Sequence, residues 1–130
     1  MRFTLIFILL CLLVTGCYRR DTRLHEEVVG TWKHGDTGKM TLNSDGSFHT
    51  IFSYTKIGST SSNDTIEWAQ DGTWDVKDGF FVFTFTNSTA RNAPVAVPVG
   101  YVSRCKITSV DDHNLIYQGP NGKDVFVNTR

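Results

Sequence analysis

The sequence predicts an all-β fold: an antiparallel up-and-down meander of about eight or nine strands. From Val28 onward, short runs rich in Val, Ile, Phe, Tyr, Trp and Thr are separated by Asp-Gly and Asn-Gly pairs. These pairs tolerate the positive φ of tight hairpin turns, which favours antiparallel neighbours. Inside the runs, apolar and polar residues alternate, as in a sheet with one buried face and one solvated face.

The expected strands follow one another from residue 28 to residue 129. They are Val28–Lys33, Lys39–Leu42, Ser47–Lys56, Thr65–Ala69, Thr73–Lys77, Phe80–Thr86, Val99–Ser109, Leu115–Gln118 and Asp124–Thr129. Turn residues predict hairpins at positions 43–46, 71–72, 78–79, 111–114 and 121–122. Two longer segments, Gly58–Asp64 and Asn87–Pro98, are expected to be loops of the kind that often carry function.

The first 16 residues have the pattern of a secretory signal peptide. Arg2 supplies a positive charge before an apolar run from Phe3 to Val14, and the small residues Thr15 and Gly16 follow. The run is shorter than the roughly 20 residues that a membrane-spanning helix needs, so an uncleaved membrane anchor is the less favoured alternative. Removal of residues 1–16 leaves residues 17–130, enough for a single domain.

Cys17 directly follows Val14-Thr15-Gly16, and this string resembles the lipobox of bacterial lipoproteins. The resemblance implies that Cys17 is acylated, with palmitate among its chains, and that the exported protein is held in a membrane of the cell envelope. More than one acyl chain makes such an anchor stable. Because Tyr18 and not Asp follows, the resemblance to enteric lipoproteins implies the outer membrane in a cell that has one. The alternative is a disulfide between Cys17 and Cys105.

Residues 17–27 are polar and charged, and we expect them to form a short tether with at most a helical turn from Thr22 to Glu27. The β domain then covers residues 28–130. The chain has 13 basic and 13 acidic residues. A nucleic acid partner is therefore not expected, because no basic excess exists to displace counterions from phosphates.

Gly30-Thr31-Trp32 followed by Asp45-Gly46-Ser47-Phe48 resembles the opening strings of small bacterial lipocalin-like domains. The resemblance implies a small barrel, filled or partly open, with Trp32 closing one end and a cavity or groove at the other. Lipocalins also place an Arg near their end over this tryptophan and add a helix after the last strand, whereas this chain reaches Arg130 without such a helix. Gly72-Thr73-Trp74 repeats the first string, through a faint duplication or through convergence.

The alternation inside the strands selects aromatic side chains for the buried face. The candidates for a ligand-facing core are Phe52, Tyr54, Trp68, Trp74, Phe83 and Tyr101. We therefore expect a binding module for a small apolar molecule or for an envelope protein. The alternatives are a structural or interaction lipoprotein with a filled core, and an exported inhibitor of a hydrolase.

No catalytic or metal-binding pattern stands out in the sequence. His25, His34, His49 and His113 lack metal-ligand spacing and are expected at the surface or in turns. Neither a Gly-X-Ser-X-Gly elbow nor a phosphate-binding loop is present. Cys105 lies on an alternating strand and is expected to be a small buried hydrophobe, not a nucleophile. We expect no enzyme activity, no cofactor and no metal.

Overall fold

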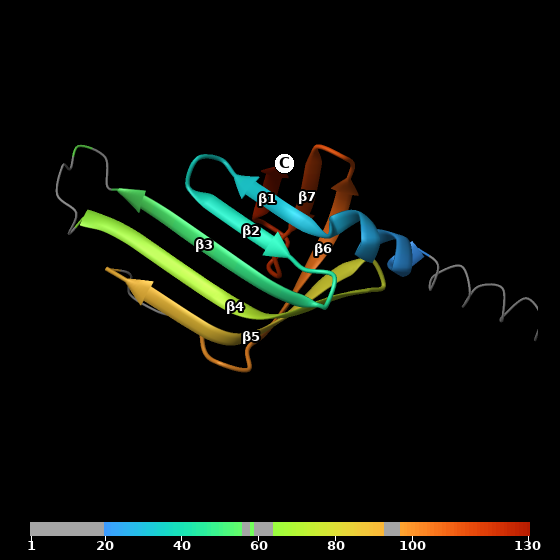
Figure 1. Cartoon of the computed structure of the whole chain (residues 1–130), viewed down its shortest axis with the longest axis horizontal. Helices are drawn as coiled ribbons and strands as arrows, with labels where there is room; N and C mark the ends of the chain where they lie inside the picture. Colours follow the sequence, from blue (N-terminus) through green and yellow to red (C-terminus); the bar gives the residue numbers. More distant parts are fainter. Residues whose placement is uncertain (1–19, 56–57, 59–63, 93–96) are drawn as a thin grey trace, which may run out of the picture.

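The computed structural model describes residues 20–55, 58, 64–92 and 97–130. The expected signal peptide, the expected acylation site Cys17 and most of the expected Gly58–Asp64 loop lie outside these residues. The described chain forms eight antiparallel strands that pair in chain order and close into a barrel (Figure 1). They are β1 (Gly30–His34), β2 (Gly38–Leu42), β3 (Ser47–Thr55), β4 (Thr65–Lys77), β5 (Phe80–Arg91), β6 (Val102–Val110), β7 (Asn114–Gln118) and β8 (Val125–Thr129). The predicted all-β meander is confirmed, and the closed barrel agrees with a lipocalin-like fold.

Strand β4 corrects one predicted hairpin. Residues 71 and 72 do not form a turn between two strands; β4 continues through them, and its register with β5 shifts there because Thr86 of β5 is left unpaired as a β-bulge. A Cβ atom at Gly72 would collide with the backbone oxygen of Thr84. Glycine is therefore required because the backbones of β4 and β5 approach closely at the bulge.

Strands β3, β4 and β5 extend together beyond the barrel (Figure 1). β5 runs to Arg91, so the first part of the expected Asn87–Pro98 loop is strand. Strand β2 pairs with β3 only as far as Phe52, and β6 pairs with β5 only as far as Thr84. We call residues 53–55, 65–69 and 88–91 the arm, since they form a three-stranded extension.

A helix over residues 20–28 packs against one end of the barrel (Figure 1). Leu24 and Val28 lie one helical turn apart and are buried in the barrel core. These two apolar residues make the described part of the expected tether a packed element. The Asp21 carboxylate accepts hydrogen bonds from the backbone N–H groups of Asp78 and Gly79, at 2.7 and 2.9 Å. None of the described helical residues belongs to a helix with the length and apolarity that crossing a membrane requires.

Trp32 lies next to this helix and is fully buried. Its Nε1 donates to the carbonyl of Val28 at 2.7 Å. The Arg130 guanidinium lies 4.2 Å from the centre of the Trp32 ring and donates to the carbonyls of Glu27 and Val29, at 3.0 and 2.8 Å. Arg130 thus takes the place that the lipocalin resemblance assigns to an arginine over the tryptophan, and the chain reaches it directly from β8.

Candidate functional site

A cavity of about 180 Å³, partly open to solvent, lies in the half of the barrel away from the helix. Strand β1 starts beside the helix and ends at His34, so His34 marks the far end. Strand β8 runs in the opposite direction, which places Phe126 at the same far end. Both residues line the cavity. The helix end is therefore packed with side chains, and the hollow part of the barrel begins beyond it.

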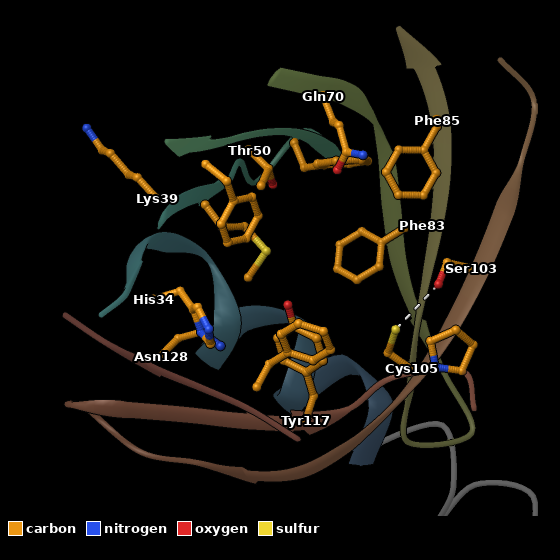
Figure 2. A pocket seen from close by; sticks show the side chains of 15 residues that line it. His34, Lys39, Thr50, Gln70, Phe83, Phe85, Ser103, Cys105, Tyr117 and Asn128 are labelled. Atoms are coloured by element: carbon orange, nitrogen blue, oxygen red, sulfur yellow. Dashed lines mark hydrogen bonds between the residues drawn. The ribbon is translucent and has the colours of Figure 1, made fainter. Parts of the chain in front are cut away.

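Aromatic rings form a large part of the cavity wall (Figure 2). Phe48 makes edge contacts with Phe83 and Phe85, with ring centres 5.1 and 5.5 Å apart. Tyr117 stacks on Phe126, with ring centres 5.0 Å apart. These edge and stacked geometries are the favourable ones for aromatic pairs. The wall is consequently well packed around a hollow of defined shape.

A second set of lining residues is polar, and it consists of His34, Thr50, Gln70, Ser103 and Asn128. Thr50 and Gln70 face each other across β3 and β4 in the register. Asn128 is only 2% exposed, and its amide donates to the carbonyl of Leu115 at 3.2 Å. The Nδ1 atom of His34 is buried and has no hydrogen-bond partner among the described residues. The cavity is therefore apolar in area but carries several hydrogen-bonding groups.

Two titratable groups of the wall, Cys105 and Tyr117, have a raised pKa that keeps them neutral. Burial raises the pKa of the Tyr117 hydroxyl far above its ordinary value. Burial also raises the pKa of the Cys105 thiol, although a hydrogen bond with Ser103 acts in the opposite direction. The Ser103 oxygen and the Cys105 sulfur are 3.5 Å apart (Figure 2). A free thiol held in its protonated form suits packing and not nucleophilic attack.

Phe52 and Phe83 are the two sequence-based candidates that line the cavity. Trp74 lies instead at the helix end, where its ring stacks on His25 with centres 4.2 Å apart. The indole nitrogen of Trp74 donates to the carbonyl of Asn43 at 3.1 Å. Trp74 therefore joins the helix to the barrel.

The other three candidates lie away from the cavity wall. Tyr54 and Trp68 pack together on the arm, with ring centres 5.9 Å apart. Tyr101 comes just before β6 and is 48% exposed, beside Phe85. None of these three side chains is part of the cavity lining.

His34 is the cavity residue that the sequence interpretation placed elsewhere, at the surface or in a turn. A signal for it exists, because Trp32 points inward and a residue two positions later on a strand shares the same face. On the outside of the barrel, His49 Nδ1 lies 2.5 Å from the Asp71 carboxylate, and His113 lies in the β6–β7 turn. Among the described residues, no three His, Cys, Asp or Glu side chains come together as a metal site.

No protein-family model matches the chain, and no curated protein matches its sequence. The function is therefore inferred from the cavity and from the sequence motifs.

Proposed function

We propose that this protein is an exported, lipid-anchored envelope lipoprotein whose barrel binds a small apolar molecule without catalysing a reaction. The observation that carries the binding role is the cavity of about 180 Å³ with its aromatic wall. The anchor rests on Val14-Thr15-Gly16-Cys17, with acylated Cys17 as the contact with the membrane, the outer one in a diderm cell.

The size of the cavity supports binding over a filled core. A barrel of eight strands is just wide enough to be filled by side chains or to hold one small ligand. Protein interiors are close-packed, and few voids exceed the size of a water molecule. A concave, mostly apolar space with a few polar groups is the usual form of a small-molecule site. We therefore assign the binding role to the half of the barrel beyond Trp32 and Phe81, which are both fully buried.

The binding role is tested by filling the cavity. Ser103 and Ser109 both lie on β6, but Ser103 is buried in the cavity wall and Ser109 is exposed. Ser103→Leu should abolish the increase in melting temperature that single-ring and short-chain apolar compounds produce, and Ser109→Leu should keep it. If no apolar compound changes the melting temperature of the unaltered protein, the binding role is wrong.

The anchor is tested by replacing Cys17 with Ser. The variant should lose labelling by radioactive palmitate and move from the membrane fraction to the soluble envelope fraction. Cys105→Ser is the matched control and should remain labelled and membrane-bound. Equal membrane association of the Cys17→Ser variant and the unaltered protein would remove the anchor from the proposal.

A second proposed role, contact with an envelope protein, is favoured by the outer edge of β8. Val125 and Val127 are 54% and 49% exposed, and β8 pairs with β1 only at Lys33 and Thr129. An extended segment of a partner can add to such an edge. A photo-crosslinking residue at Val127 should capture a discrete species that the same residue at exposed Lys77 does not. Equal products at both positions would count against this role.

A further inference from the structure

The polar atoms of the cavity wall are the starting point for the chemistry of its ligand. His34 Nδ1 is buried and has no hydrogen-bond partner within the described residues, and Thr50 and Tyr117 place hydroxyl groups in the same wall. Thr50 and Tyr117 are 6% and 9% exposed. A buried polar group without a partner costs about 1–3 kcal/mol. A molecule that hydrogen-bonds these groups is therefore favoured over one that only fills the space.

The cavity volume matches a ligand of about one ring. A cavity of roughly 150 Å³ lined by apolar side chains is sufficient for benzene, and the cavity here measures about 180 Å³. A fatty acid with a long acyl chain does not fit within this volume. Phe48, Phe83 and Phe85 present ring edges and faces, which pack well against a flat aromatic molecule.

The charge of the wall limits the ligand further. Lys39 contributes to the lining, but its side chain is exposed and is directed away from the cavity (Figure 2). The other side chains of the wall include no Arg, Lys, Asp or Glu. Burial of an ion without a partner of opposite charge is strongly unfavourable. The absence of such a permanently charged side chain therefore favours uncharged molecules.

The two tautomers of the His34 imidazole determine which ligand group can form a hydrogen bond with Nδ1. In a neutral histidine one ring nitrogen donates and the other accepts, and either can be the acceptor. A hydroxyl group both donates and accepts, so it satisfies His34 Nδ1 in either tautomer. It also satisfies the hydroxyl of Thr50 or Tyr117 in whichever direction that group is turned.

We propose that the cavity binds a small, uncharged phenol: a single aromatic ring with a hydroxyl group, hydrogen-bonded to His34. This inference rests on the proposed binding role and specifies the ligand for the same site. The ring packs against the phenylalanine side chains, and the hydroxyl lies toward the polar part of the wall.

The test compares phenol, benzene, benzoate and laurate on the full chain in phospholipid nanodiscs. The methyl group of Met40 lines the cavity, so its NMR signal reports occupancy of the cavity itself. Nanodiscs without the protein correct for partition of each compound into lipid. One hydrogen bond to a buried group is worth about tenfold in affinity, so phenol should bind about tenfold more tightly than benzene. Benzoate and laurate should leave the Met40 signal unchanged.

Variants then assign the preference to His34. His34→Phe keeps a ring and removes the nitrogen, so the ratio of the phenol and benzene affinities should fall to about one. His49→Phe is the matched control on the outer face and should keep the ratio. Because benzene binding is the internal reference, a partial change of cavity shape does not affect the conclusion.

The outcomes separate the two proposals. If none of the four compounds shifts the Met40 signal, the binding role itself fails. If benzene binds as tightly as phenol, if benzoate or laurate binds more tightly, or if His34→Phe keeps the preference, the cavity binds ligands but the phenol inference is overturned.

Discussion

The two ends of the barrel differ in how their side chains are used. At the helix end, Trp32 and Phe81 are fully buried, and the helix over residues 20–28 adds Leu24 and Val28 to the same core. At the other end, aromatic rings of similar size surround a cavity of about 180 Å³. The same kind of apolar residue therefore builds a packed core in one half of the barrel and a hollow wall in the other.

The polar groups differ in the same way. At the helix end, the indole of Trp32, the guanidinium of Arg130 and the carboxylate of Asp21 are all hydrogen-bonded to backbone groups. In the cavity, His34 Nδ1 is buried and has no hydrogen-bond partner within the described residues. The helix end therefore contributes most to stability, whereas the cavity end provides the capacity to bind. Four substitutions or conditions test this division.

The largest expected effect comes from the two tryptophans Trp32 and Trp68. Trp32→Ala should lower the free energy of unfolding by about 3–5 kcal/mol, because it leaves a large void at the packed end. Trp68→Ala on the arm should cost less than half as much, since Trp68 is only half-buried. Urea unfolding followed by circular dichroism measures both values. Equal losses would show that the two ends contribute equally to stability.

The next effect compares two glycines. Gly72→Ala should cost about 1–3 kcal/mol or more, because the added methyl group meets the backbone of Thr84 and the strands must separate. Gly38→Ala meets the ring of Phe52, which can rotate, so its effect on stability should be smaller. Its main effect should be weaker ligand binding, because Phe52 lines the cavity. Thermal unfolding and the Met40 titration together distinguish these outcomes.

Asp21 tests the contribution of the helix. Asp21→Ala removes the acceptor for two backbone N–H groups of the β4–β5 turn and should cost about 1 kcal/mol, because solvent replaces part of the interaction. Ligand affinity should not change, since the cavity lies in the other half of the barrel. Denaturant unfolding measures the cost, with Glu26→Ala as an exposed control on the same helix. A loss of binding in Asp21→Ala would contradict the division between the ends.

The smallest effect is a dependence on alkaline pH. Because burial raises the pKa of the Cys105 thiol in the folded state, unfolding releases a proton at high pH. The stability from the neutral thiol is fully present below the unfolded value of about 8.5 and decreases as the pH rises toward the folded value. The urea midpoint should therefore fall above this pH. In Cys105→Ala, measured in parallel, the decrease should be smaller; an identical decrease would exclude the thiol as its cause.

The strands and most turns were predictable because they depend on local chemistry. The Asp78-Gly79 turn has positive φ at both residues, 55° and 77°, as a tight hairpin requires. The continuation of β4 through Asp71-Gly72 was not predictable, because an Asp-Gly pair is also typical of turns, and only the pairing with β5 decides between the two. For the helix, the sequence indicated at most one turn from Thr22 to Glu27. Its apolar pattern is weak, because only Leu24 and Val28 face the core.

The site was only partly predictable. Alternation indicates which face of a strand a side chain occupies, but it does not give the height of that side chain along the barrel axis. Phe83 and Trp74 are both inward-facing, yet Phe83 lines the cavity and Trp74 packs under the helix. The height depends on strand register and on the bulge, which are long-range properties. The polar wall residue His34 was not predicted either. It lies one residue beyond the predicted end of the first strand at Lys33, so the alternation of that strand was not extended to it.

The contact between Arg130 and Trp32 lies where the barrel closes, because Trp32 is on β1 and Arg130 directly follows β8. Closure therefore joins residues that are far apart in the chain, and such contacts form slowly during folding. Until β8 pairs with β1, β1 presents an unpaired edge, which is the part of a sheet most prone to aggregate. The cation–π contact of Arg130 thus also protects the folded chain against association through that edge.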